Sequence, residues 1–262
     1  MIAKILKWFE ILGKKTIDIF EEAGSLTILF FKTVQLIFRK PFSFRSVIYQ
    51  MLEIGVNSIP VIIITSLSTG MVLALQTGIS LEQKIQGMSQ FMGGIVAISM
   101  TRELGPVLTS LIVTGRVCSA IAAEIGTMKV TEQIDALHTL ATNPVQYLSV
   151  PRLLAAVVML PILALFSDFI GIIGGLFVST TKLSMSSTSY IDNVFLYLKF
   201  RDVTNGLIKA VVFGGIIAVV GCHMGFRTSG GAEGVGRSTT RAVVLASMLI
   251  LIFDYILTAL LF

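Results

Sequence analysis

Stretches of apolar residues separated by short polar connections make up most of the chain. Residues 54–81 carry no charged side chain, and an α-helix needs about 20 apolar residues to cross the hydrocarbon layer of a membrane. The pattern predicts five transmembrane helices. They cover about residues 52–76, 91–123, 153–181, 206–226 and 242–262.

Ionisable residues occur within several of these spans. Arg102 and Glu103 lie in the second span, directly before the Gly-Pro pair at 105–106. A proline removes one backbone hydrogen bond from a helix interior, so we expect this span to be kinked or broken there. Asp168 and Asp254 interrupt the third and fifth spans. Because a charge in hydrocarbon is costly, such residues usually face a cavity or a partner.

Residues 1–45 are amphipathic rather than uniformly apolar. In the first 15 residues, apolar side chains recur at helical spacing between lysines, as in a helix that lies in the membrane interface. The apolar positions are Ile2, Ile5, Phe9 and Leu12. The run at 26–38 contains Lys32 and is too short to span, so it predicts a second interfacial or elbow helix.

Composition supports the membrane assignment. Hydrophobic residues make up 54% of the chain and charged residues 13%, and the mean hydropathy is +0.88, far from the average of soluble domains. The chain is therefore predicted to be an all-α integral membrane protein without a separate soluble domain. Its net charge of +5 suggests basic cytoplasmic loops rather than binding to nucleic acid.

The distribution of lysine and arginine predicts the orientation in the membrane. If the N-terminus is inside the cell, the cytoplasmic segments hold 14 of these residues and the outer segments hold five. Basic residues are retained on the cytoplasmic side, so we expect a cytoplasmic N-terminus and a periplasmic C-terminus. With no transit peptide, the expected location is the inner membrane of a bacterium.

A polar segment, AEIGTMKVTEQIDALHTLATNP at 123–144, separates the second and third spans. As a helix over about 128–141, it places one apolar and one acidic face on opposite sides. The apolar positions are Val130, Ile134, Leu137 and Ala141, and the acidic face carries Glu132, Asp135 and Thr139. Either the segment is a solvated connection, or its acidic face docks on a soluble partner with basic residues.

Motifs for catalysis and for metal binding do not occur in the sequence. There is no GxxxxGK[ST] loop for ATP phosphates, no HExxH, no GxSxG and no Cys-x-x-Cys. The glycine-rich GGAEGVG at 230–236 lacks both the phosphate-binding spacing and the lysine. His138 is isolated, so we predict no metal site. The chain is thus expected to be a non-catalytic subunit.

Several motifs together carry a family resemblance over roughly residues 45–262. They are RELGPVLTSLIVTGRVCSAIAAEIGTMKVTEQIDAL at 102–137, GMVLALQ at 70–76, SVPRLLAAVVMLP at 149–161, IKAVVFG at 208–214, and GVGRSTTRAVV with DYILTALLF near the end. The chain resembles the MlaE (YrbE) family of ABC-transporter permeases. Residues 46–262 would then form the permease domain, preceded by the interfacial helices.

The resemblance implies the function and the partners. Such a permease is a homodimer that works with two cytoplasmic P-loop ATPase subunits and with a periplasmic MCE-domain lipid-binding protein. It moves phospholipid or a related lipid between membranes. ATP and magnesium would be bound by the ATPase, and no cofactor is expected in this chain.

The resemblance also assigns a role to the polar segment. Residues 128–141 look like the coupling helix that fits into the ATPase. Glu132, Gln133 and Asp135 are the candidate contacts in this helix. Glu124 opens the segment and could equally shape the turn out of the second span or touch the ATPase.

The candidate lipid-binding residues lie within the spans. Arg102 or Glu103 would line a cavity for a phosphate headgroup, unless they pair with the aspartates at 168 or 254 to fix helix packing. Lys209 could meet a headgroup or extend to the interface. Met71, Leu75 and Phe91 could contact lipid tails, although each could equally be an ordinary packing residue.

Two other classes of function stay open. A secondary transporter or channel that works without ATP would require an inverted repeat and polar residues along several helices, and no repeat is evident. An intramembrane enzyme acting on lipid would require paired catalytic groups at one depth, and the two histidines, His138 and His223, lie in different segments.

Overall fold

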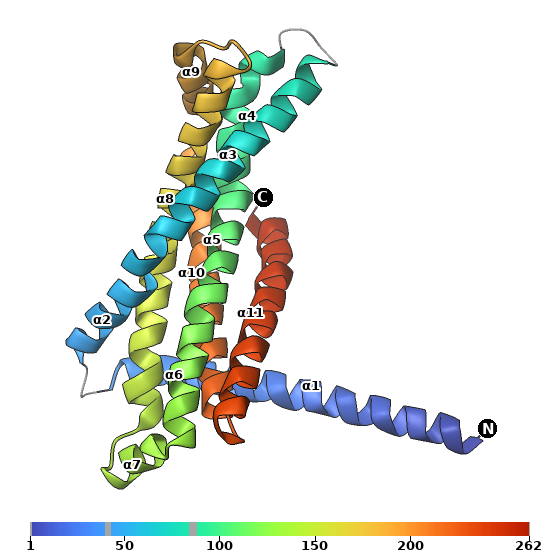
Figure 1. Ribbon diagram of the computed structural model, residues 1–262, viewed down its shortest axis with the longest axis vertical. Helices are drawn as coiled ribbons and strands as arrows, with labels where there is room; N and C mark the ends of the chain where they lie inside the picture. The colour runs from blue at the N-terminus through green and yellow to red at the C-terminus, as the bar shows by residue number, and fades with distance from the viewer. Residues whose placement is uncertain (1, 40–42, 84–87, 262) are drawn as a thin grey trace.

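The computed structural model describes residues 2–39, 43–83 and 88–261, and these form a bundle of long helices with no strand (Figure 1). The α-helices are α1 (Ile2–Ile37), α2 (Phe44–Ile54), α3 (Ile59–Glu82), α4 (Met92–Ser99), α5 (Gly105–Val113), α6 (Ser119–Val130), α7 (Gln133–Thr139), α8 (Val150–Thr181), α9 (Ser187–Tyr197), α10 (Phe200–Phe226) and α11 (Gly231–Leu261). Short 3₁₀ segments are η1 (Val56–Ser58) and η2 (Met88–Phe91). Three π-helical segments are η3 (Met100–Leu104), η4 (Thr114–Cys118) and η5 (Val145–Ser149).

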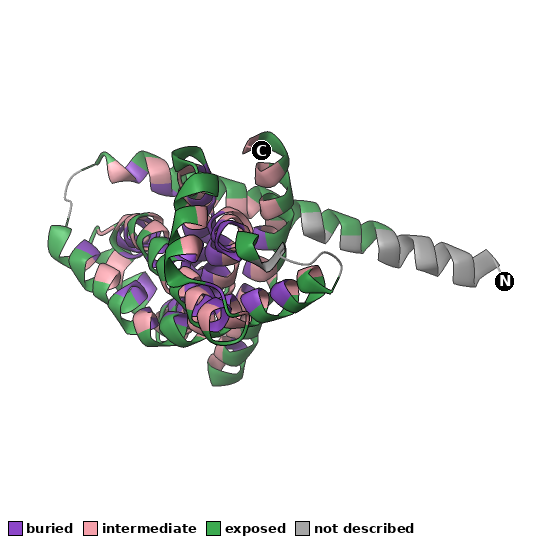
Figure 2. Ribbon diagram, turned by 90° about the horizontal axis from the view of Figure 1, so that it is seen from above, coloured by how far each residue is buried: buried purple, intermediate pink, exposed green. Residues whose placement is uncertain are grey.

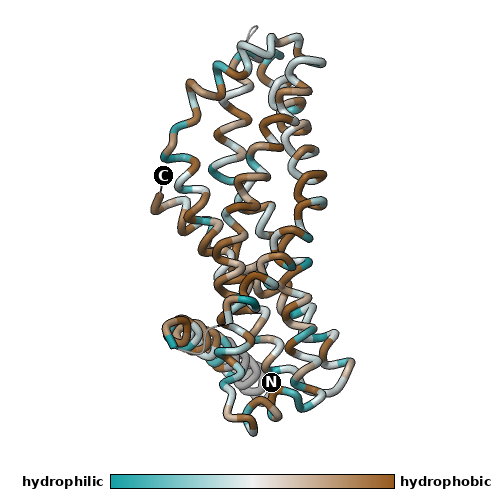
Figure 3. Tube along the Cα trace, turned by 90° about the vertical axis from the view of Figure 1, so that its left-hand side faces the viewer, coloured by the Kyte–Doolittle hydropathy of each residue, from teal (hydrophilic) through white to brown (hydrophobic). Residues whose placement is uncertain are grey.

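Five stretches of the described chain are long and apolar enough to cross a membrane. They are Phe44–Glu82, Met92–Val130, Val145–Thr181, Phe200–Phe226 and Gly231–Leu261, and Figure 3 shows hydrophobic residues along these upright helices. The prediction of an all-α membrane protein with five spans is confirmed. Most helices extend beyond the predicted limits, because helical geometry continues into polar residues that an apolar window leaves out.

The N-terminal region forms one helix instead of the two that we expected. α1 is continuous over 36 residues and runs across the bundle near α7 rather than along the spans (Figure 1). The segment between the two predicted helices contains no proline that would end a helix. The side chains of Ile2, Ile5, Phe9 and Leu12 lie outside the described residues, so the interfacial position stays a prediction.

Small residues bring α8 close to its neighbours in the middle of the bundle, where Figure 2 shows the buried positions. A Cβ atom on Gly70 of α3 would collide with the backbone of Gly171 in α8, and one on Gly174 would lie 2.5 Å from the backbone oxygen of Leu67. Small residues at such crossings let helix backbones approach closely. The glycine-rich run at 171–175 therefore serves helix packing.

The second span is continuous over Met92–Val130 rather than broken, and beside the Gly-Pro pair it changes from α-helical to π-helical geometry. The π-helical η3 ends at Leu104, immediately before Gly105 and Pro106. Pro106 has no N–H, so the carbonyl of Arg102 lacks the usual donor four residues along the chain. The ammonium group of Lys209 takes that place and donates to the Arg102 carbonyl over 3.0 Å. The carbonyl freed by Pro106 thus joins the second span to α10.

Candidate functional site

Five charged side chains meet between the second, fourth and fifth spans and form what we term the charged network. Arg102 and Glu103 come from η3, Asp202 and Lys209 from α10, and Asp254 from α11. The network lies within three stretches that are long and apolar enough to span a membrane. Because charges are costly in such surroundings, their mutual pairing is what allows them to be accommodated.

Lys209 is the centre of the charged network and is completely buried, with 0% of its side chain exposed. Its Nζ lies 2.8 Å from Glu103 Oε1 and 3.0 Å from Asp254 Oδ1, and it also donates to Thr258 Oγ1 over 2.7 Å. A lysine ammonium has three N–H groups. The two carboxylates, the threonine hydroxyl and the Arg102 carbonyl therefore surround it with acceptors.

Arg102 pairs with a buried aspartate at the edge of the charged network. Its Nη2 and Nε lie 2.8 and 2.9 Å from Oδ1 of Asp202. The Arg102 side chain is 38% exposed and that of Asp202 only 5%. The other oxygen of Asp202, Oδ2, accepts from the backbone N–H of Lys199 over 3.0 Å, at the first turn of α10. The helix start thereby fixes the carboxylate that orients the arginine.

These pairings differ from the alternatives that the sequence offered. Arg102 pairs with Asp202 rather than with Asp168 or Asp254. Asp202 escaped the sequence reasoning because the fourth span was expected to begin at residue 206, whereas α10 begins at Phe200. An aspartate at the third position of a helix is a capping signal that could have revealed it.

Two other ionisable residues of the spans also lie elsewhere than expected. Lys209 does not extend to the interface, because the early start of α10 places it deep within the helix. Asp168 is buried against Gly105, and its Oδ1 has no hydrogen-bond partner among the described residues. Asp168 is therefore separate from the charged network.

The apolar candidates lie on other elements than the charged network. Met71 and Leu75 belong to α3, and Met71 packs against a buried cluster that includes Met92 and Met100. Leu75 is exposed, and Phe91 is exposed beside Tyr197, with ring centroids 6.3 Å apart. The structure brings the charged candidates together, while these apolar residues line a different part of the bundle.

The polar segment between the second and third spans is not one helix over 128–141. α6 ends at Val130, and α7 begins only at Gln133. Between them the chain bends at Glu132, which has a left-handed φ of 61°. The chain bends again at Ala141, with φ 56°. The predicted apolar face is thus shorter, and Ile134 buries its side chain in the main apolar cluster while Leu137 packs against it.

The acidic side of the polar segment is exposed. Glu132, Gln133 and Asp135 are all exposed, and Lys129 Nζ lies 3.1 Å from Asp135 Oδ1. At this exposure the ion pair stabilises the fold little. The segment therefore presents hydrophilic side chains outward from a short helix that is anchored by one buried isoleucine.

Comparison with known proteins identifies the family. The family described as Permease MlaE matches residues 47–260. The chain belongs to the MlaE permease family. It is a multi-pass membrane protein and a permease of the ABC-transporter class, and both the charged network and the α7 segment lie within the matched residues.

Relatives of this MlaE permease occur in bacteria and in plants. A probable ABC transporter permease protein of Rickettsia felis is 46% identical over 255 residues, which cover 95% of this chain and 96% of the relative. One from Synechocystis is 44% identical, covering 83% of this chain and 82% of the relative. The Arabidopsis thaliana protein TRIGALACTOSYLDIACYLGLYCEROL 1, chloroplastic, is 37% identical, covering 91% of this chain and 67% of the relative.

An ion pair between a buried arginine and an exposed glutamate joins α6 to α8 in the MlaE permease, close to α7. Nη2 of Arg152 lies 2.6 Å from Oε2 of Glu124. Nη1 of the same guanidinium donates to the carbonyl of Leu148 in η5 over 2.7 Å. Glu124, which opens the polar segment, is therefore engaged by an arginine that the sequence reasoning did not single out. Arg152 lies near the start of α8, after the Asn-Pro pair at 143–144. This sequence context gave no indication of the partner of Arg152.

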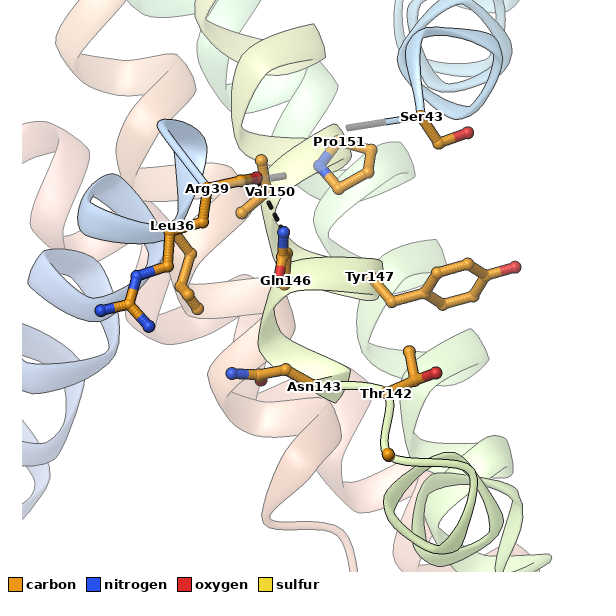
Figure 4. A pocket seen from close by; sticks show the side chains of 10 residues that line it. Leu36, Arg39, Ser43, Thr142, Asn143, Gln146, Tyr147, Val150 and Pro151 are labelled. Atoms are coloured by element: carbon orange, nitrogen blue, oxygen red, sulfur yellow. Dashed lines mark hydrogen bonds between the residues drawn. The ribbon is translucent and has the colours of Figure 1, made fainter. Parts of the chain in front are cut away.

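Two cavities lie around α1 in the permease. One of about 300 Å³ opens between the end of α1 and the chain after α7 (Figure 4), where Gln146 Nε2 donates to the carbonyl of Arg39 over 2.9 Å. The other, of about 610 Å³, is almost wholly apolar and lies between α1, α8, α10 and α11. Both cavities show that α1 rests on the bundle without filling the space beside it.

Proposed function

We propose that this MlaE permease is the membrane subunit of an ABC transporter that moves phospholipid, or a related lipid, between membranes. Membership of the family supports the transporter class. The name of the Arabidopsis relative refers to a galactolipid, trigalactosyldiacylglycerol, which favours a lipid as the transported molecule. A separate P-loop ATPase would bind ATP and magnesium and supply the energy, and a periplasmic MCE-domain protein would exchange lipid with the permease.

The charged network is the observation that carries the proposal. It places Arg102, 38% exposed, within an apolar span and beside a carboxylate that is 5% exposed. A guanidinium has five donors arranged to bind phosphate oxygens. Arg102 would therefore meet the phosphate of a headgroup, while Lys209 holds Glu103 and Asp254 in place behind it.

Apolar surface on other elements of the bundle than the charged network would accommodate the lipid tails. Met71, Leu75 and Phe91 offer flexible or aromatic side chains on α3 and η2. Two copies of the permease would enclose such a path between them, and for this reason we propose a homodimer as the functional unit. In each copy, the charged network would face the shared path.

The short helix α7 would couple ATP hydrolysis to the permease. Glu132, Gln133 and Asp135 would contact basic residues in a groove of the ATPase, while the buried side chain of Ile134 holds α7 against the spans. In this arrangement the α7 end of the bundle lies in the cytoplasm. The N-terminus is then cytoplasmic and the C-terminus periplasmic, in the inner membrane.

Lipid content tests the headgroup site. The permease is purified in mild detergent from its native membrane, and phospholipid per chain is measured by mass spectrometry. We expect Arg102→Ala to lose most of the bound phospholipid and to keep any copurifying ATPase. Arg201→Ala is the matched control, since Arg201 is an exposed arginine on the same helix end as Asp202. Equal phospholipid in wild type, Arg102→Ala and the control would contradict the assignment.

A further inference from the structure

We propose that the ion pair of Arg152 and Glu124 is a mechanical clamp that makes the second and third spans follow α7 together. The inference rests on the proposed function, because it requires an ATPase that moves α7. It assigns Arg152 as a positioning residue. Glu124 then acts through Arg152, rather than by touching the ATPase itself.

The clamp closes the base of a loop in the chain. α6 enters this loop from the second span, α7 forms its tip, and η5 and α8 return from it into the third span. Arg152 stands at the start of α8 and binds Glu124 of α6 over 2.6 Å. The same guanidinium binds the Leu148 carbonyl of η5 over 2.7 Å. One side chain therefore ties together both ends of the loop that carries α7.

A second contact links α7 itself to the clamp. Lys129 near the end of α6 lies 3.1 Å from Asp135 of α7. This pair is exposed and screened by water and salt. Displacement of α7 thus reaches α6 directly through the backbone and this pair, and it reaches α8 through the clamp.

The burial of Arg152 distinguishes the clamp from an ion pair in which both side chains are exposed. The Arg152 side chain is 4% exposed and that of Glu124 is 56% exposed, and Arg152 Nε has no hydrogen-bond partner among the described residues. Burial of a charge carries a desolvation penalty that a single pair often fails to recover, so such a pair is a weak means of stabilisation. A role in holding two helices at a defined position explains the buried arginine better than stability does.

The test separates assembly from coupling. Wild-type and variant permeases are reconstituted in phospholipid vesicles with the copurified ATPase, and ATP hydrolysed per lipid transferred is measured. The variant Glu124→Gln with Arg152→Met removes both charges without leaving one unpaired. We expect it to retain the ATPase and to raise the ATP used per lipid at least about fivefold. This factor is the lower end of the range that is typical of coupling between two sites. Arg152→Lys, which keeps the charge pair, should restore much of the coupling.

A matched control is available on α11. Arg237 and Glu233 form an exposed ion pair of 2.7 Å within one helix. Glu233→Gln with Arg237→Met removes the same two kinds of charge, but from a pair that does not join different helices. This double variant should leave the ratio of ATP to lipid unchanged.

Three results would overturn the clamp. One is an unchanged ratio in the double variant, which would make the pair a packing contact. Another is a folded double variant that no longer binds the ATPase, which would make Glu124 a direct docking residue. If the double variant is not recovered folded, Glu124→Gln alone is measured. An unchanged ratio of ATP to lipid in this single variant is the third result that would overturn the clamp. Failure of the wild-type permease to retain any ATPase would instead contradict the proposed function.

Discussion

Lys209 allows the energetics of the charged network to be tested most sharply. Replacement by methionine keeps an unbranched side chain, one atom shorter, and removes the charge. Glu103 and Asp254 then lose their shared partner, and the Arg102 carbonyl loses its donor. The perturbation therefore breaks ion pairs and a backbone hydrogen bond around a fully buried position.

The size of the effect follows from burial. Removal of one partner from a buried ion pair costs about 3–5 kcal/mol. The lower part of this range applies here, because Glu103 is 38% and Asp254 20% exposed and water can solvate the unpaired carboxylates in part. In a protein of this size, 1 kcal/mol shifts Tm by about 2–4 °C. We therefore expect Lys209→Met to lower the apparent Tm by roughly 10 °C.

The assay is thermal unfolding in detergent. Unfolding is monitored as the loss of the monodisperse peak in size-exclusion chromatography. The matched variant combines Lys209→Met with Glu103→Gln and Asp254→Asn, so that no unpaired charge is left. It should recover most of the lost Tm. A Tm for Lys209→Met within about 2 °C of wild type would refute the reasoning, and equal losses in both variants would show that packing, not charge, is responsible.

Two other features give direct predictions. Glu132→Lys and Asp135→Lys reverse exposed charges on the proposed docking surface; each should leave insertion and Tm unchanged and weaken ATPase binding about tenfold, as measured by retention on the immobilised permease. Undiminished binding in both variants would remove α7 as the docking element. Gly70→Val places side-chain atoms against the backbone of α8 and should lower Tm by several degrees, whereas Gly215→Ala, with nothing within 4 Å, should not. Equal Tm values for these two glycine variants would contradict the close helix crossing.

The spans and the irregularity near Pro106 in the second span could be predicted because they depend on local properties. An apolar run of sufficient length has few alternatives to a membrane helix. A proline removes a donor in any surroundings, so Pro106 indicated an interruption. Its π-helical form and the donation from Lys209 to the freed carbonyl could not be foreseen, since they depend on the helix that packs alongside.

The partners of the charged residues required the tertiary structure. Arg102 and Asp202 are 100 residues apart in the chain, and the sequence does not state which helices are neighbours. The partner of Arg152 also required the tertiary structure. From the sequence, Glu124 was interpreted without reference to Arg152. Apolar windows also placed the start of α10 too late, and this error concealed both Asp202 and the depth of Lys209.

The ends and bends of helices were also difficult to predict. Glu132 adopts a left-handed conformation without being glycine or asparagine, so the usual indicators of a turn were absent. In α1 the opposite occurred, because a change from one amphipathic pattern to another suggested two helices where the backbone continues as one. Hydrophobic periodicity indicates which face is buried, but it does not determine where a helix ends.

ATP-dependent lipid transfer tests the central claim most directly. The permease is isolated from its native membrane with its copurifying proteins, which are identified by mass spectrometry, and is reconstituted between donor and acceptor vesicles with labelled phospholipid. The account predicts a P-loop ATPase and an MCE-domain protein in the complex, and transfer that requires ATP hydrolysis. A permease that is isolated alone and moves lipid or ions at the same rate without ATP would contradict it and favour an ATP-independent transporter.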